Sequence, residues 1–586
     1  MTSNTDAINT MHLTDASTAT LMPIAIGERI QSIDVIRGFA LIGIFFMNVE
    51  WFNRAFGDFG NGIQPGLNGI NYWASYFVNY FVAGKFWTIF SLLFGMGFAV
   101  MLSSAEKNGN AFIKLYIRRI LALGAFGILH TLLLWPGDIL YSYAFTAAGL
   151  LIILFGRWKW ILISLAGLAG FVFIPGMESF GAVLGGIVFM AIIALYLRNE
   201  KIITLFGVRL PLFSAILAVI GTLLFCAAVV SFFIAKMHDA RTPLCLAAFF
   251  TLLTAWLSTR FHQPVESRLW RIGAYLYTFP FLVMLAFSFT KWNEPVRNVM
   301  DSPAAVALAA EKALEKIALE KLTETEKKIL QDKNNKARKS MSEEKKKLEE
   351  DAERINRITE MKSDVAKEII VLSKGTYTET VKHRTEVFFK NPFDPAGLMF
   401  VAIGMFLLGV WFVRSGIITH DRDNLPLFRR IALIGLPIGL GLSVLSSLIT
   451  VSHLPGQNGD HWMAANAVLE LANLPACLAY MSIVILMFHS KTIFCHIRVL
   501  APYGRMALTN YLMQSLFQAW FFYGWGLSYF GMGRANQLLF AIAIILLQII
   551  FSHWWLNRFA YGPMEWIWRG ITYWQFPKFR LSPAVA

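Results

Sequence analysis

Long apolar stretches dominate this 586-residue sequence and restrict what it can fold into. A helix needs roughly 17–25 mostly apolar residues to cross a bilayer, and fourteen stretches fit that description. They cover 34–52, 86–104, 117–135, 138–156, 159–175, 180–197, 211–235, 242–259, 271–290, 395–413, 427–451, 463–488, 506–526 and 538–556. The fifth and sixth are short, which leaves open whether both cross. Because lipid offers no partner to an open strand edge, the sequence predicts an all-α, polytopic transmembrane helical bundle.

Charged residues are few and unevenly distributed. They make up 15% of the chain, against about 25% in ordinary soluble proteins. The segment Asn293–Pro392 alone holds 21 Lys and Arg and 19 Asp and Glu. The predicted organisation is a cytoplasmic tail (1–28), an N-terminal transmembrane core (29–156), further transmembrane helices (157–292), a charged insert (293–392) and a C-terminal transmembrane domain (393–586).

The basic residues of the short loops predict the orientation. With a cytoplasmic N-terminus, the inner segments hold 24 Lys and Arg, and the short outer loops hold five. This asymmetry follows the positive-inside rule and predicts that both termini are cytoplasmic and that the insert lies outside. The formal net charge of +15 then reflects loop asymmetry. We therefore expect membrane lipids, and not nucleic acid, as partners.

The charged insert resembles two helices joined by a turn. Leucines and isoleucines recur at near-helical spacing on both sides of Asn334–Ser340, where we place the turn. Ser340 followed by Glu343 predicts a capping-box start for the second helix. The simplest interpretation is a packed, solvated helical hairpin. The alternative is a docking arm for a protein partner.

The first span begins with a polar motif. Asp34 and Arg37 are three residues apart, so they share a helix face and can pair. Asn48 follows eleven residues after Arg37, about three helical turns further on, within the same broad sector. Ionisable residues within spans are costly unless they are paired or used. The motif is therefore either an interfacial ion pair with a packing asparagine or the cytoplasmic mouth of a ligand site.

A second polar cluster surrounds the turn between the third and fourth spans. His130 lies shortly before the Trp135-Pro136-Gly137 turn, and Asp138 begins the returning helix. A His and an Asp at the ends of antiparallel neighbours can meet as a base and its orienting carboxylate. The alternative for His130 is a hydrogen-bonded packing residue.

Three further segments carry polar residues. Asn510 and Gln514 are four apart on one face of the thirteenth span, behind Arg505 at its start. Glu470 in the twelfth span is an acid that needs a partner. The motif around Glu565 fits an interfacial aromatic belt. In the second span, Ser91 and Gly95 form a small-xxx-small pair, which indicates close helix packing.

Several common sites are not expected in this sequence. The four cysteines lie in or beside apolar stretches and form no CxxC pair, so we expect no metal site and no disulfide framework. Phosphate-cradling loops and nucleophile elbows have no counterpart in the sequence either.

Five motifs resemble, in order, those of the YeiB-type family of bacterial membrane proteins. They read IDVIRGFALIGIFFMN, FSLLFGMGF, RRILALGAFGILHTLLLWPGDILYSYA, PYGRMALTNYLMQS and YGPMEWIWR. They span Arg29–Phe155 and roughly Pro395–Trp574, whereas Asn293–Pro392 looks like an addition. The resemblance implies a bacterial cytoplasmic (inner) membrane protein.

That family is similar to transmembrane acyltransferases, including the lysosomal heparan-glucosaminide N-acetyltransferase. That enzyme also begins with a D-x-x-R-G helix and carries an acetyl group from cytosolic acetyl-CoA to a luminal sugar amine, with a histidine implicated. The more distant acyltransferase-3 family has Arg-x10-His in its first helix, where this chain has Arg37 and Asn48. Because Asn cannot act as a general base, the catalytic role moves to His130.

The resemblance therefore implies an acyltransferase that uses cytoplasmic acyl-CoA, which is acetyl-CoA in the family pattern. The acceptor would be an extracytoplasmic hydroxyl or amine group on a glycan or small molecule. His130 is the expected base and Asp138 its orienting partner. The expected donor-binding residues are Arg37, Asn48, Arg118, Arg119, Arg505, Asn510 and Gln514. His130 lies eleven residues beyond Arg119, about 17 Å along a helix, which is comparable to an extended pantetheine arm.

Two other functions fit the same sequence. A transporter or flippase would use the polar groups within the spans to bind its substrate and would rearrange for alternating access. A non-catalytic scaffold would present the insert to a partner, but this leaves the intramembrane His and Arg clusters unexplained. The sequence also leaves open whether the protein forms a homodimer.

Overall fold

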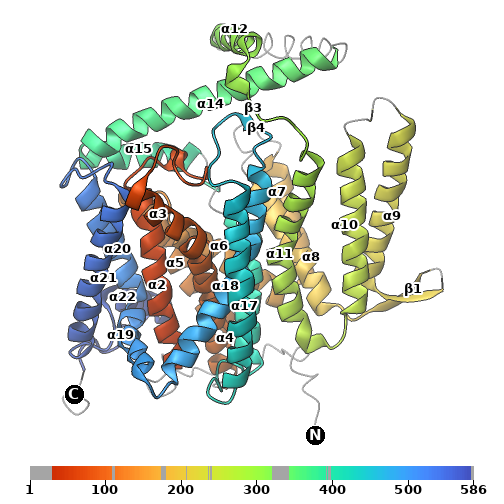
Figure 1. The fold of residues 1–586 in the computed structure, drawn as a ribbon. Coiled ribbons are helices and arrows are strands. Elements are labelled where there is room, and N and C mark those ends of the chain that lie inside the picture. Colours follow the sequence, from red (N-terminus) through yellow and green to blue (C-terminus); the bar gives the residue numbers. More distant parts are fainter. Residues whose placement is uncertain are drawn as a thin grey trace.

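The computed structural model describes residues 30–581 except 108–111, 173–179, 206, 235–236, 238–239, 320–341, 391 and 394–396. The protein is an all-α polytopic helical bundle, as predicted (Figure 1). Each of the fourteen predicted spans coincides with one helix. These helices are α2 (Gln31–Phe52), α4 (Lys85–Lys107), α5 (Phe112–Leu133), α6 (Ile139–Phe155), α7 (Trp158–Val172), α8 (Phe180–Arg198), α9 (Leu212–Phe233), α10 (Arg241–Arg260), α11 (Arg268–Thr290), α16 (Met399–Arg414), α17 (Leu425–Ile449), α18 (Trp462–Phe488), α20 (Ala507–Phe522) and α21 (Arg534–Leu556).

Length and composition support membrane crossing for most of these helices. Within the described residues, eight helical stretches are long and apolar enough to cross a membrane. Four shorter apolar helices accompany them, namely Ile139–Phe155, Trp158–Ala169, Val183–Arg198 and Met399–Arg414. The two short spans of the sequence prediction, five and six, are among these shorter helices.

Additional short elements connect the spans. The loop between α2 and α4 contains α3 (Gly69–Phe77), which the apolar pattern did not predict. The short strands β1 (Ile202–Leu205) and β2 (Val208–Pro211) form an antiparallel hairpin, and β3 (Arg297–Asn298) pairs with β4 (Gln457–Asn458). Helices α19 (Leu500–Arg505) and α22 (Pro563–Tyr573) flank the last two spans.

The bundle has two distinct ends. Helix α2 starts, and the described chain finishes, at one end, which we call the termini end, and the insert lies across the opposite end, the insert end (Figure 1). This arrangement agrees with an even number of crossings. Which end faces the cytoplasm remains a prediction from the loop charges.

The insert contains three described helices, α12 (Pro303–Leu319), α14 (Glu343–Lys374) and α15 (Tyr377–Lys390). The predicted turn Asn334–Ser340 lies outside the described residues. The predicted capping residue Ser340 also lies outside them; α14 is capped by Ser342, whose side chain accepts a hydrogen bond from the Lys345 amide. The hairpin prediction also missed α15, whose polar sequence carries no apolar stripe long enough to signal a separate helix. The first two helices share an apolar core of Val299, Ala305, Ala309, Ala352, Ile355 and Ile358.

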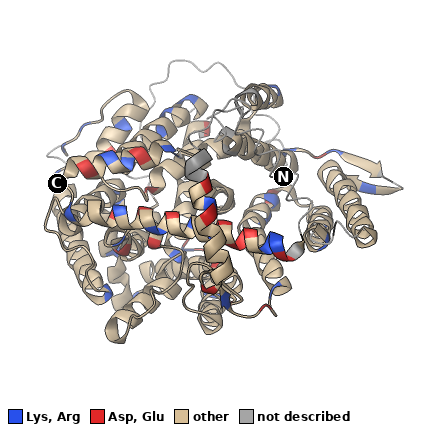
Figure 2. Ribbon diagram, turned by 90° about the horizontal axis from the view of Figure 1, so that it is seen from above, with Lys and Arg blue, Asp and Glu red and all other residues tan. Residues whose placement is uncertain are grey.

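The insert is fastened to the bundle and does not stand away from it. Arg384 Nη1 donates to the Leu133 carbonyl at 2.9 Å, at the end of α5. The Gly524 amide donates to the Leu372 carbonyl at 2.8 Å. Seen from the insert end, acidic and basic residues gather on the helices that cross this face (Figure 2). The insert thus forms a charged cover over one end of an apolar bundle, and its binding of a protein partner remains untested.

The small-xxx-small pair of α4 lies at close helix contacts, as expected: Gly95 faces α16, and Ser91 Oγ lies 2.7 Å from the Tyr143 hydroxyl of α6. A Cβ atom built on Gly95 would lie 2.1 Å from the Phe406 carbonyl oxygen, and one on Gly409 would lie 2.1 Å from the Leu92 carbonyl oxygen. These two glycines therefore allow α4 and α16 to approach closely.

Gly95→Ala should destabilise the protein, because the added methyl group meets backbone that cannot yield. We expect a loss of about 1–3 kcal/mol, the usual cost of overpacking, seen as a lower unfolding midpoint in detergent. Gly97→Ala is the matched control on the same helix, since a Cβ there meets nothing within 4 Å. Equal midpoints for the two variants would contradict this packing.

Candidate functional site

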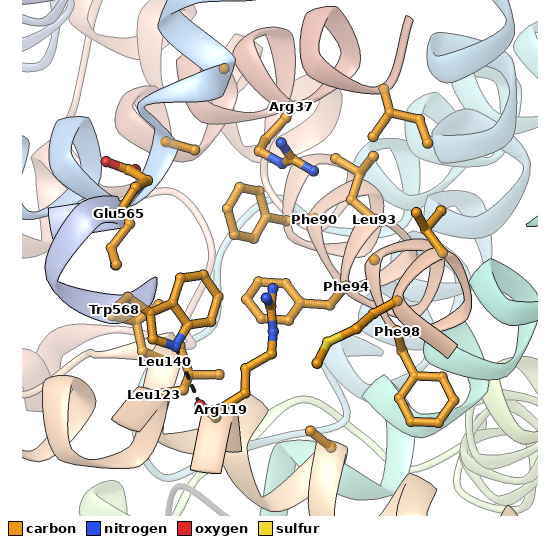
Figure 3. Close-up of a pocket in the computed structure, with 18 of the residues that line it drawn as sticks. Arg37, Phe90, Leu93, Phe94, Phe98, Arg119, Leu123, Leu140, Glu565 and Trp568 are labelled. Atoms are coloured by element: carbon orange, nitrogen blue, oxygen red, sulfur yellow. Dashed lines mark hydrogen bonds between the residues drawn. The ribbon is translucent and has the colours of Figure 1, made fainter. Parts of the chain in front are cut away.

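A pocket of about 260 Å³ opens between the helices near the termini end, and we call it the inner pocket. It is formed by α2, α4, α5, α6, α19, α20 and α22. Its charged lining consists of Arg37, Arg119, Arg505, Arg569, Asp34 and Glu565. Four guanidinium groups thus face two carboxylates. Arg37 and Arg119 project into the same space between aromatic rings (Figure 3).

Both carboxylates of the inner pocket already have partners. Asp34 forms a 2.8 Å ion pair with Arg37, as the sequence spacing predicted. Glu565 accepts hydrogen bonds from the Leu508 and Thr509 amides at 2.7 and 3.0 Å, which caps the start of α20. Neither Arg119 nor Arg569 forms an ion pair with a carboxylate among the described residues. The pocket therefore keeps excess positive charge and favours an anion.

The two adjacent arginines of α5 have different surroundings. Arg119 lies over the Trp568 ring at 4.1 Å and lines the inner pocket. Arg118 lies over the Trp574 ring at 5.2 Å and does not line it. Only Arg119 of the two predicted donor-binding residues lines the inner pocket, because successive helical residues point about 100° apart. Donor binding by Arg118 stays a prediction.

The remainder of the inner pocket is apolar. Its wall includes Phe90, Leu93, Phe94, Phe98, Leu123 and Leu140. Cations at one end and an apolar interior suit a ligand with an anionic head and a slender, less polar arm.

A larger cavity of about 1130 Å³ lies towards the insert end, and we call it the outer cavity. Asn48, Asp138, Glu470 and several aromatic residues line its bundle side. Asn48 therefore does not share a pocket with Arg37, contrary to expectation. The eleven residues between them correspond to roughly 17 Å along α2, which carries Asn48 to the other cavity.

His130 and Asp138 meet as predicted. His130 Nδ1 lies 2.8 Å from Asp138 Oδ1, and both side chains are buried. The second oxygen of Asp138 accepts from the Tyr141 amide at 2.8 Å, which caps α6 and fixes the carboxylate. His130 Nε2 has no hydrogen-bond partner among the described residues. The ring thus has one nitrogen oriented by a carboxylate and the other unused, although His130 itself lines neither cavity.

Tyr511 stands at the junction of the two cavities. Its side chain, together with Ile44 and Ile139, lines both of them. The Tyr511 hydroxyl donates to Asp138 Oδ1 at 3.3 Å, and its ring centre lies 5.2 Å from that of His130. The inner pocket and the outer cavity therefore adjoin at the buried His130–Asp138–Tyr511 cluster.

Asn510 and Gln514 belong to a buried packing network and line neither cavity, so their donor-binding role stays a prediction that this arrangement does not support. Asn510 Nδ2 donates to the Tyr503 carbonyl and to Ser552 Oγ, at 3.1 and 3.0 Å. Gln514 Nε2 donates to the Tyr503 hydroxyl at 2.7 Å and to Gln548 Oε1 at 3.1 Å. Helical spacing correctly predicted that the two side chains share a face. It could not show that residues of α19 and α21 supply their hydrogen-bond partners.

The sequence did not predict that α22 contributes to the inner pocket. Arg569 and Glu565 line it, although their motif was interpreted as an interfacial belt. A charged pair four residues apart within an aromatic motif was the available signal. The partners that Glu470 needed are Asn473, whose Nδ2 donates to it at 2.9 Å, and the buried Lys85, which interacts with it electrostatically.

Comparison with known proteins supports the family resemblance. Residues 412–575 match a family described as "Protein of unknown function (DUF418)". The relative named "Uncharacterized protein YxaH" from Bacillus subtilis (strain 168) is 24% identical over 571 residues, which cover 95% of this chain and 98% of the relative. "Uncharacterized protein YeiB" from Escherichia coli (strain K12) is 32% identical over 171 residues, which cover 29% of this chain and 43% of the relative.

The chain is therefore similar to YeiB-type bacterial membrane proteins, and the family model matches its C-terminal part. A further relative, the "Uncharacterized 39.9 kDa protein in amylase 3'region" of Bacillus acidopullulyticus, is 37% identical over 137 residues, 23% of this chain and 37% of the relative. No solved structure matches. The family match covers Arg505, Tyr511, Glu565 and Arg569. These YeiB-type relatives name no activity, so the function rests on the geometry of the site.

Gln514→Ala should lower stability, because it leaves buried polar groups of Tyr503 and Gln548 with fewer partners. We expect a loss of about 1–3 kcal/mol in the free energy of unfolding, measured by thermal unfolding in detergent. Met513→Ala, at an exposed neighbouring position of α20, should change it by no more than about 0.5 kcal/mol. An unchanged midpoint for Gln514→Ala would contradict the structural role of the network.

Proposed function

We propose that this protein is a membrane-embedded acyltransferase. It would move an acyl group, acetyl in the simplest case, from acyl-CoA at the termini end to a hydroxyl or amine at the insert end. The observation that carries the proposal is the junction of the two cavities. An arginine-lined pocket and a separate outer cavity adjoin at Tyr511, beside a His130–Asp138 pair.

The inner pocket suits the donor. Arg37, Arg119, Arg505 and Arg569 would hold anionic groups of the CoA head at the mouth. The pocket volume of about 260 Å³ accommodates the thioester arm rather than the whole molecule. The apolar wall would then direct the arm towards Tyr511. Transfer through the bundle would not require CoA itself to cross the membrane.

The His130–Asp138 pair suits general-base catalysis. Asp138 holds Nδ1, so Nε2 is the nitrogen that would accept a proton from the acceptor. The acceptor oxygen or nitrogen would attack the thioester carbonyl, a new C–O or C–N bond would form, and the C–S bond would break. The CoA thiolate would leave and take up the proton from His130. Because His130 lies behind the cavity wall, the Tyr511 ring would have to turn aside to expose Nε2.

A transporter is the second candidate, and one observation favours it. Lys85 is fully buried, its Nζ has no hydrogen-bond partner among the described residues, and it interacts with Glu470 at the outer cavity. Ionisable groups within spans often mark ion or substrate pathways. Binding of acyl-CoA separates the two functions, because a transporter of another substrate has no need of it.

Arg119→Gln should weaken binding of acetyl-CoA, whereas the adjacent Arg118→Gln should not. Loss of a charge-assisted hydrogen bond from the inner pocket costs about 1.5–3 kcal/mol, or roughly 10- to 150-fold in affinity. Isothermal titration calorimetry on detergent-solubilised protein measures both variants, which remove the same charge from neighbouring residues.

Equal losses in the two variants would remove the inner pocket from the donor site and indicate a nonspecific charge effect. Failure of the unmodified protein to bind acetyl-CoA would favour the transporter. Retention of full affinity by Arg119→Gln would exclude Arg119 from donor binding.

A further inference from the structure

The charged insert contributes to the outer cavity a buried arginine whose guanidinium group is only partly hydrogen-bonded. Arg384 of α15 is 3% exposed and lines that cavity. Its Nη1 donates to the Leu133 carbonyl at 2.9 Å. Its Nε and Nη2 are buried and form no hydrogen bond of ordinary geometry among the described residues, although the Tyr523 side chain interacts with the guanidinium group. A buried donor left unpaired is costly, so this state calls for an explanation.

The two unpaired nitrogens lie on one edge of the guanidinium group. The N–H bonds of Nε and Nη2 point in parallel, which is the geometry that accepts both oxygens of a carboxylate or phosphate. The Tyr523 ring lies 5.4 Å from the guanidinium carbon and supports its face. Arg384 thus presents a rigid, desolvated fork.

Glu368 is the carboxylate that acts on this arginine most closely. It interacts electrostatically with Arg384, but one of its oxygens accepts from the Phe56 amide at 3.1 Å. Burial is the main cause that raises the pKa of Glu368. Glu368 therefore already binds the Phe56 backbone and is more readily protonated than a surface glutamate. It competes only weakly with an external anion for the guanidinium group of Arg384.

The cavity gives a ligand access from outside. Its lining runs from exposed insert residues to the buried Arg384 and Asp138. The other ionisable groups facing it are Asp364, Glu368, Glu386, Glu470, Lys367, Lys390, His383, Tyr511 and Tyr523. The carboxylates suit hydroxyl or amine groups of the same ligand, whereas Arg384 suits an anionic group.

We propose that Arg384 forms an anion-binding site in the outer cavity for a phosphate or carboxylate group carried by a small molecule or a lipid headgroup. Anion binding itself is independent of acyl transfer. Only the further step, that this ligand is the acyl acceptor with its hydroxyl or amine towards Asp138, rests on the proposed function.

Thermal unfolding of the full chain with inorganic phosphate tests the site, with sodium chloride at equal ionic strength as the reference. A ligand that binds only the folded state raises the midpoint, and we expect a rise of roughly 2 °C or more. Arg384→Gln should reduce the apparent phosphate affinity at least about tenfold. Lys382→Gln is the matched control, because Lys382 is exposed on the same helix and does not line the cavity.

A second variant tests the same site independently, so that the test does not depend on the folding of Arg384→Gln. Val387 is 50% exposed, lines the cavity and lies three residues after Arg384. Val387→Glu should fold and place a carboxylate beside the fork, which would abolish the phosphate effect. Lys382→Glu adds an acid outside the cavity and should retain the effect.

Nanodiscs distinguish the two sources of the anion. If the natural ligand is a headgroup, the unmodified protein should unfold at a higher temperature in phosphatidylglycerol discs than in phosphatidylcholine discs, and Val387→Glu should lose this difference. A rise with phosphate alone indicates a soluble ligand. No rise from either source, or a full response in folded Arg384→Gln or Val387→Glu, would overturn the proposal. Because no readout depends on acyl transfer, failure here leaves the proposed function standing.

Discussion

The pairing of charges inside an apolar bundle is the constraint on which the rest of this structure depends. Lipid cannot solvate an ion, so every ionisable group within the spans needs a partner or a polar cavity. Asp34 pairs with Arg37, and Glu565 accepts from the start of α20. Arg119 and Arg569, which form no ion pair with a carboxylate among the described residues, face the inner pocket. The location of a candidate site therefore follows from electrostatics as well as from the shape of the bundle.

The insert changes the character of the opposite end. A helical bundle with short loops would leave the His130–Asp138 side open to the outside. Here α14 and α15 are bonded to the ends of α5 and α20 and roof a cavity above it. The cavity wall is thus built partly from the apolar helices of the bundle and partly from the charged insert. The insert can then determine which molecules reach the buried pair.

Periodicity predicted the helices because the bilayer imposes one length and one type of element. It also predicted contacts formed within a few residues, such as Asp34 with Arg37 and His130 with Asp138. It failed where the outcome depends on another helix. Gln514 is satisfied by Gln548 on α21, and Arg569 reaches the inner pocket from α22. Neither neighbour is visible in the spacing of a single span.

A structure determined by electron cryomicroscopy with acetyl-CoA present tests the central claim most directly. The account predicts density for the anionic head beside Arg119, Arg505 and Arg569. The thioester end should reach the junction at Tyr511, with the outer cavity free of CoA. Density for the head in the outer cavity, or an inner pocket that excludes the ligand at saturating concentration, would contradict it.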